Sequence, residues 1–254
     1  MAVKRVPTGI KGFDDLIEGG LPANSATLLS GSPGTGKTLF CLEYLVTGAK
    51  NGETGMIISF EQQATDILSQ ALEFNWEFQK LVDEGKIIVK YVDILEDENL
   101  FDDIREMVKK NQVKRLVIDS LTAMQNYPAM LRHAEKLQVV ITRNDKVRWT
   151  IHEQSLRRMI VHYFVEALKE LEGTTTILIS DTKDENPALS SDGISEFLCD
   201  AVIVLYYTGI SGDDARNLQI RKIRWTKQKK GFFQYEFGPN GIEISNEGSG
   251  VMMK

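Results

Sequence analysis

The stretch Gly31-Ser32-Pro33-Gly34-Thr35-Gly36-Lys37-Thr38 matches the pattern G-x-x-x-x-G-K-[ST], the Walker A motif or P-loop. The residues before it, 26–30 (Ala-Thr-Leu-Leu-Ser), predict a short buried strand. After it, leucine and valine recur at helical spacing up to Gly48, which predicts a helix. A glycine-rich turn between a strand and a helix is the context that this motif requires. We therefore interpret it as a phosphate-binding loop; the alternative is an incidental glycine-rich turn.

The chemistry of this loop predicts a nucleoside triphosphate ligand. Its glycines permit a backbone whose N–H groups point inward, and the start of the helix adds attraction for an anion. We expect Lys37 to reach the β- and γ-phosphates of ATP and the Thr38 hydroxyl to bind Mg²⁺. The residues expected to hold the nucleotide are Ser32, Pro33, Gly34, Thr35, Gly36, Lys37, Thr38 and Leu39.

The composition excludes several classes of protein. With 42% hydrophobic and 26% charged residues in 254, the chain has the composition of a globular protein with a sizeable core. Its apolar runs are too short to span a membrane, and we expect no signal peptide and a cytoplasmic location. Two cysteines exclude a disulfide framework. A net charge of −6 argues against nucleic-acid binding by the whole surface and leaves room for a local basic patch.

Strand and helix patterns alternate along most of the chain. Strands are predicted at residues 26–30, 55–60, 87–91, 115–120, 174–180 and 201–207, and helices at 64–72, 100–110 and 156–171. Residues 7–22 predict a short helix between two turn signals, which Gly19-Gly20 ends. This alternation predicts an α/β fold with a mostly parallel twisted sheet flanked by helices. Segments 218–226, 232–237 and 242–244 predict antiparallel strands that close one side of the sheet, and 181–193 predicts a surface loop. No repeat or linker divides the chain, so we expect one domain over residues 1–254.

Two acids follow predicted strands on the side of the sheet where the P-loop lies. Ligands of open α/β sheets bind at the carboxyl ends of the strands, where Glu61 and Asp119 are expected. An aspartate that closes an apolar strand is the Walker B pattern, in which the carboxylate holds Mg²⁺ directly or through water. The alternative for both residues is an ordinary carboxylate at the end of a strand.

Several segments, in order along nearly the whole chain, resemble the KaiC family of RecA-like ATPases. They are residues 7–15, 19–22, 34–40, 58–61, 80–86, 117–122, 196–197 and 222–224. The resemblance implies one KaiC-type domain, with archaeal single-domain relatives, some described as RadA paralogues, as the nearest match. It implies that Glu61 polarises the attacking water. The family commonly has a second glutamate where this chain has Gln62, which cannot act as a base, so we expect hydrolysis to be slow.

A run of cations near the C-terminus holds a second expected part of the site. Lys222 and Arg224 lie two apart on a predicted strand, so their side chains share a face. The resemblance implies a homo-oligomer, with a hexameric ring as one form, in which this pair reaches the γ-phosphate on a neighbouring subunit as an arginine finger does. The alternative is a lysine-rich edge strand that discourages aggregation.

The segment of about 128–150 is an expected insertion relative to the family; it holds basic residues such as Arg132 and Lys136 and the aromatic Trp149. It predicts a hairpin, with strands at 139–142 and 147–151, and basic and aromatic residues favour single-stranded DNA as one ligand. A structural hairpin or a lid for a protein partner is the alternative.

Three functions follow from these patterns: a Mg²⁺-dependent ATPase with its active site at a subunit interface, a nucleotide-sensing module that governs an unidentified protein partner, and an accessory protein in DNA recombination or repair. Gln62 favours the second.

Overall fold

The computed structural model describes residues 3–95, 99–125, 127, 153–182, 189–208 and 215–245. Within this part a nine-stranded sheet has the strand order β11-β10-β9-β8-β3-β7-β6-β4-β5. Its strands are β3 (Ala26–Gly31), β4 (Gly55–Ser59), β5 (Ile87–Tyr91), β6 (Arg115–Asp119), β7 (Thr175–Asp181), β8 (Ala201–Thr208), β9 (Ala215–Ile223), β10 (Phe232–Gly238) and β11 (Gly241–Ile244). A separate two-stranded sheet pairs β1 (Arg5–Val6) with β2 (Leu21–Pro22).

The strand directions confirm the predicted fold class. Strands β8, β3, β7, β6, β4 and β5 pair in parallel, while β9, β10 and β11 extend the sheet in antiparallel pairs beyond β8. Strands β3, β4 and β6 are buried along their whole length, as their continuous apolar sequences require, because helices cover both faces. Strand β5, at the edge of the sheet, is only partly buried.

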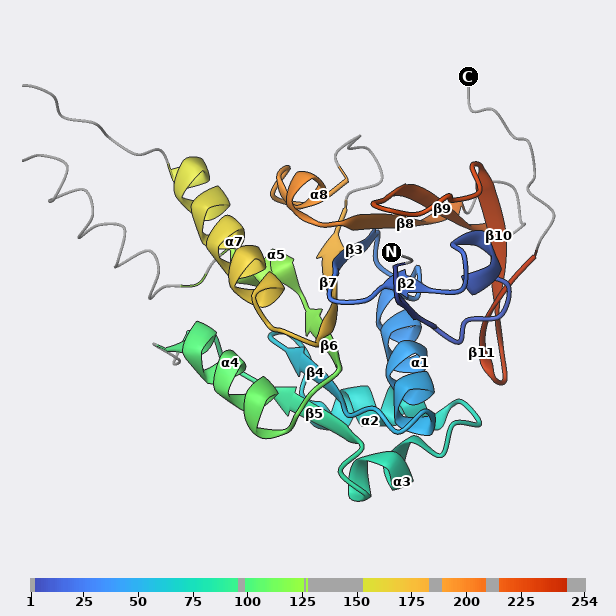
Figure 1. The fold of residues 1–254 in the computed structure, drawn as a ribbon, viewed down its shortest axis with the longest axis horizontal. Coiled ribbons are helices and arrows are strands. Elements are labelled where there is room, and N and C mark those ends of the chain that lie inside the picture. The colour runs from blue at the N-terminus through green and yellow to red at the C-terminus, as the bar shows by residue number, and fades with distance from the viewer. Residues whose placement is uncertain are drawn as a thin grey trace, which may run out of the picture.

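Helices lie on the two faces of the sheet in separate layers (Figure 1). They are α1 (Lys37–Lys50), α2 (Ala64–Leu72), α3 (Phe78–Asp83), α4 (Leu100–Lys110), α5 (Leu121–Met124), α7 (Glu153–Lys169) and α8 (Ser195–Leu198). Figure 1 shows α1, α2 and α3 on one side of the sheet and α4 and α7 on the other. Each face of the sheet has its own hydrophobic core, and the side chains of successive strand residues point to opposite faces. Leu29 therefore packs in the core with α1, and its neighbour Leu28 packs in the core with α7.

The short helix predicted within residues 7–22 is present only as a single turn. The structure has only a 3₁₀-helix at Asp14–Leu16, set between β1 and β2. The Asp14 carboxylate accepts hydrogen bonds from the backbone N–H groups of Thr8 and Gly9 at 3.0 Å, which folds the segment back on itself. Gly9 adopts a φ of 81°, in the left-handed region, so a continuous helix could not pass through it.

Some sequence-based predictions fall outside the described residues. The inserted segment of about 128–150, the hairpin strands at 139–142 and 147–151, and half of the predicted loop at 181–193 lie there. In the part of the chain that is described, no helix combines the length and the apolar character needed to cross a membrane. Cys41 and Cys199 are both buried free thiols.

Candidate nucleotide-binding site

The predicted phosphate-binding loop joins β3 to α1 at the carboxyl edge of the parallel strands. Gly34 and Gly36 take φ values of 81° and 86°, which side chains other than glycine rarely adopt. A Cβ on Gly36 would also lie 2.5 Å from the ring of Phe237 on β10. From the same strand, the Tyr235 hydroxyl donates a hydrogen bond of 2.6 Å to the Thr35 carbonyl. Strand β10 therefore contacts the P-loop and supports its conformation.

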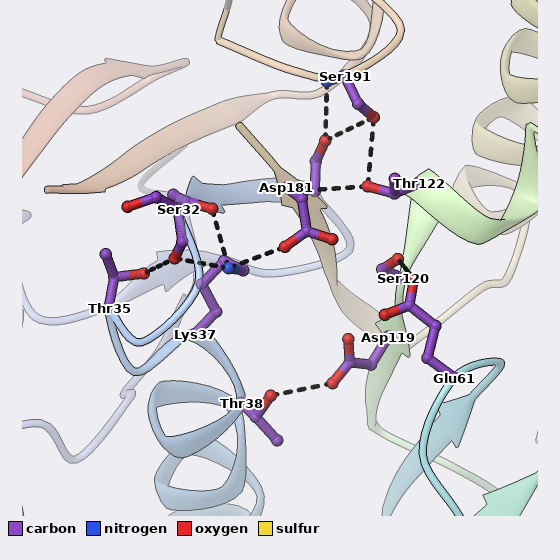
Figure 2. A network of polar contacts seen from close by, with 12 residues as sticks. Ser32, Thr35, Lys37, Thr38, Glu61, Asp119, Ser120, Thr122, Asp181 and Ser191 are labelled. Carbon is purple, nitrogen blue, oxygen red and sulfur yellow. Dashed lines mark hydrogen bonds and ion pairs between the residues drawn. The ribbon is translucent and has the colours of Figure 1, made fainter. Parts of the chain in front are cut away.

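Lys37 is buried and uses its ammonium group within the loop. Its Nζ donates to the backbone carbonyls of Gly31 at 2.9 Å and Ser32 at 3.0 Å, and forms an ion pair with the Asp181 carboxylate at 3.0 Å. Figure 2 shows Lys37 and Asp181 pointing toward one another from α1 and β7.

Thr38 and Asp119 meet as the two motifs predict. The Thr38 hydroxyl donates to Asp119 Oδ2 at 3.0 Å (Figure 2). Burial raises the pKa of Asp119 to about 6, the Thr38 hydrogen bond opposes this rise, and the negative charges of Glu61 and Asp181 add to it. A cation here would stabilise the charged carboxylate, and hydroxyl and carboxylate oxygens are ligands that Mg²⁺ accepts. The pair fits Mg²⁺.

Such a metal would need further ligands from outside the protein. Among the described residues no group of three or more His, Cys, Asp or Glu side chains is arranged to hold a metal ion. Magnesium in nucleotide sites usually keeps several waters and binds phosphate oxygens besides one or two protein groups. The Thr38–Asp119 pair is therefore suited to a metal that arrives with a nucleotide.

Glu61 follows β4 and faces the same region. Its Oε1 accepts a hydrogen bond of 2.7 Å from the Ser120 hydroxyl, beside Asp119 on the neighbouring strand. The Ser59 hydroxyl accepts from the backbone N–H groups of Glu61 at 3.3 Å and Gln62 at 2.9 Å, which shapes the turn after the strand. These contacts hold the Glu61 carboxylate in place beside the Thr38–Asp119 pair.

A cavity of about 510 Å³ opens in front of the loop. Its lining residues are Pro33, Gly34, Gly36, Lys37, Thr38, Leu39, Leu42, Glu61, Gln62, Gln70, Glu73, Phe74, Asp119, Asp181 and Phe237. Most of the residues predicted to hold ATP are among them. Ser32 and Thr35 are not, since their side chains are buried and the Thr35 hydroxyl donates to the Ser32 carbonyl at 2.8 Å.

Two lining residues were missed by sequence reasoning. Asp181 lay in a segment that we interpreted as a polar surface loop, although it is an acid directly after an apolar strand, the same signal that Glu61 and Asp119 carry. Phe237 lies on β10, far from the P-loop in sequence, and only the arrangement of the strands brings it to the loop.

Lys222 and Arg224 do not join this site within one chain. Lys222 pairs with Val202 at the start of β8, whereas Gly31 at the start of the loop pairs with Leu205, so the two levels differ by about 10 Å along the strands. The Lys222 ammonium donates to the Glu196 carbonyl at 2.8 Å, and burial, followed by the charge of Arg224, lowers its pKa. Arg224 pairs with the buried Asp200 carboxylate at 3.1 Å, and its side chain is 45% exposed.

Comparison with known proteins relates this arrangement to a family. The family profile described as "ATPase: KaiC" matches residues 6–141 and 130–249. Circadian clock oscillator proteins KaiC from Prochlorococcus marinus (strain MED4) and Parasynechococcus marenigrum are 34% and 33% identical over 258 residues, 96% of this chain. The chain spans 45% of the length of each of these relatives.

A solved structure of similar extent also matches. The KaiC-like protein from the archaeon Pyrococcus horikoshii OT3 superposes with a TM-score of 0.77 at 34% identity, covering 96% of this chain and 99% of that one. The profile, the relatives and the fold agree, and the chain belongs to the KaiC family of RecA-like ATPase domains.

Proposed function

We propose that this protein binds Mg²⁺·ATP in the cavity before the P-loop and hydrolyses it, with an active site that a second copy of the chain completes. The observation that carries the proposal is the meeting of Lys37, Thr38, Asp119 and Glu61 at one cavity. Lys37 and Thr38 come from the P-loop, whereas Glu61 and Asp119 follow two other strands, and together their side chains supply the groups that phosphoryl transfer needs.

Different residues of the cavity bind the phosphates and the metal. The backbone N–H groups of the loop and the Lys37 ammonium bind the phosphates, while Thr38 and Asp119 hold the metal. When bound, Mg²⁺ neutralises charge that develops on the phosphate oxygens. The leucine and phenylalanine side chains in the lining, Leu39, Leu42, Phe74 and Phe237, offer apolar surface to the rest of the nucleotide.

Glu61 orients the attacking water. Its Oε1 is held by the Ser120 hydroxyl, so Oε2 remains to accept a hydrogen bond from water at the terminal phosphate. Gln62 lines the same cavity and adds an amide that can position water without removing its proton. We therefore expect turnover to be slow for an enzyme of this class.

Lys222 and Arg224 act on a neighbouring copy. Their separation from the cavity of their own chain, the 45% exposure of Arg224, and the exposed aromatic rings of Phe197 (71%) and Trp225 (63%) beside them support a contact surface at this end of the sheet. A cationic surface of this kind complements a cavity lined by carboxylates. A closed ring of identical subunits is the arrangement that a head-to-tail contact generates.

A phosphate-release assay with Glu61→Gln tests the catalytic assignment. The variant keeps its size and its hydrogen bond from Ser120, so nucleotide binding should persist while turnover falls by about a hundredfold, in the range typical of general-base removal. Glu73→Gln, a change at an exposed residue of the same cavity lining, is the matched control and should keep turnover. Turnover of the wild type equal to the blank at saturating Mg²⁺·ATP would remove the enzymatic proposal.

That last result would favour the second candidate, a nucleotide-sensing module that acts on a protein partner. Gln62 in the cavity lining supports it, because hydrolysis then depends on one carboxylate. A role in DNA recombination or repair rests on the segment of about 128–150, which lies outside the described residues, and on the basic residues Lys227, Lys229 and Lys230.

A further inference from the structure

Asp181 has a fixed position beside the P-loop. It closes β7, the strand next to β3, and pairs in register with Gly31, the first residue of the loop. The Thr182 N–H donates to the Gly31 carbonyl at 3.2 Å, and the Asp181 N–H donates to the Thr122 hydroxyl at 3.0 Å (Figure 2). The backbone of Asp181 therefore stays at the level of the loop, and its carboxylate can leave Lys37 only by rotating about its side-chain bonds.

The Lys37 ammonium has three donors, and Asp181 occupies the one that a phosphate can take. The other two donors bond to the carbonyls of Gly31 and Ser32, which belong to the loop itself. The Asp181 side chain is 37% exposed, so its carboxylate can turn to water. A phosphate that binds Lys37 must displace this carboxylate.

The charges of the cavity lining oppose a polyphosphate that arrives without a metal. Four carboxylates, from Glu61, Glu73, Asp119 and Asp181, and one ammonium, from Lys37, are among the lining residues. When a phosphate displaces the Asp181 carboxylate from Lys37, that carboxylate remains as an anion beside the phosphates. Like charges at such short range in a partly buried site repel strongly. A divalent cation on the phosphates offsets that repulsion.

We propose that Asp181 is a specificity-determining residue that occupies Lys37 until a nucleotide arrives, and that it makes the cavity select metal-bound over metal-free nucleoside triphosphate. The inference rests on the proposed function, because it assumes that the cavity binds such a nucleotide. It adds a requirement that the Walker motifs do not contain. In the absence of Mg²⁺, Asp181 competes with the phosphates for Lys37; with Mg²⁺ bound, the phosphates win.

Equilibrium binding of a fluorescent ATP analogue tests this, measured with excess Mg²⁺ and with EDTA on the full chain. Asp181→Asn keeps the shape of the side chain and removes its charge, so affinity for the metal-free analogue should rise by about tenfold, while affinity for the Mg²⁺-bound analogue should change by less than about threefold. Asp181→Glu retains the charge and should restore the preference of the wild type for the metal-bound form.

Glu73→Gln is the matched control, because it removes a carboxylate from the same lining that is not a recorded partner of Lys37. An equal gain in this variant would assign the effect to general cavity charge and overturn the role of Asp181. Equal metal dependence in wild type and Asp181→Asn would also overturn it. Asp181→Ser, a smaller neutral side chain, provides the same test if thermal unfolding shows that the asparagine variant is not folded. A wild type that binds neither form would instead overturn the proposed function, and the inference with it.

Discussion

The two groups of charged residues predicted for the active site lie at opposite ends of the parallel strands. At the carboxyl ends of β3, β4, β6 and β7, carboxylates surround Lys37 in a cavity. At the amino end of β8, Lys222 lies on the paired strand β9, and Arg224 lies in the turn just after that strand. The sequence resemblance assigns both groups to one active site, but the structure separates them within a chain. Because the two groups lie at different levels of the sheet within one chain, the proposal of a shared active site requires a second copy of the chain.

Arg224→Ala tests the intermolecular half and has the largest expected effect. If Arg224 acts on a neighbouring copy, hydrolysis should fall on the order of a thousandfold while nucleotide affinity is largely kept, because the guanidinium acts on charge in the transition state. Wild-type specific activity should also rise with protein concentration. Phosphate release measured over a range of protein concentrations checks both expectations.

The control for this variant follows from its ion pair. Arg224→Ala leaves the buried Asp200 carboxylate without this partner, and the loss of the ion pair lowers stability by itself. Asp200→Asn breaks the same pair and retains Arg224, so it should keep hydrolysis. Mixing Arg224→Ala with Glu61→Gln should restore some activity, since one copy's Glu61 meets the other's Arg224. If the mixture stays inactive and the rate is independent of protein concentration, Lys222 and Arg224 are surface charges without a catalytic role.

Lys37→Ala tests the intramolecular half. Loss of the buried ammonium should weaken binding of Mg²⁺·ATP by about a hundredfold or more, because no other cation is among the described lining residues of the cavity. Titration with a fluorescent nucleotide measures this. Lys50→Ala removes an exposed lysine from the last turn of the same helix and should bind as the wild type does. Equal affinity in the two variants would contradict the site.

Glu43→Gln tests the contact between the P-loop helix α1 and β11 and has the smallest expected effect. Glu43 on α1 accepts a hydrogen bond of 2.8 Å from the Ile242 N–H on β11, and burial raises its pKa from 4.5 to about 7. The folded state then binds this proton more tightly than the unfolded state. Stability therefore falls as pH rises from about 4.5 to 7 and is constant above that range.

Glutamine can accept the same hydrogen bond without titrating, so above pH 7 the variant should be more stable than the wild type by roughly 2 kcal/mol. Near pH 4.5 the two should be alike. Denaturant unfolding at both pH values measures this, with Glu236→Gln, an exposed glutamate on β10, as the control. A difference that does not change with pH would contradict the assigned pKa.

Local patterns were enough to predict much of the fold. Apolar runs predicted the strands β3, β4, β5 and β6, and the alternation of these strands with helices predicted a parallel sheet. The segment before β3 failed, because hydrogen bonds from Thr8 and Gly9 to the Asp14 carboxylate and the positive φ of Gly9 override its helical pattern. Neither feature can be recognised from residue spacing.

The sequence by itself determined the P-loop, since its glycines, Lys37 and Thr38 lie next to one another and act through their own backbone. It also identified Glu61 and Asp119, because acids at the ends of parallel strands must reach the same edge of the sheet. Only the tertiary structure decided that β7 lies beside β3, which brings Asp181 to Lys37, and that β10 brings Phe237 to Gly36. The order of strands in a sheet depends on packing between distant segments, so no local pattern contains it. The same packing places Lys222 and Arg224 at the far end of the sheet, away from the cavity of their own chain.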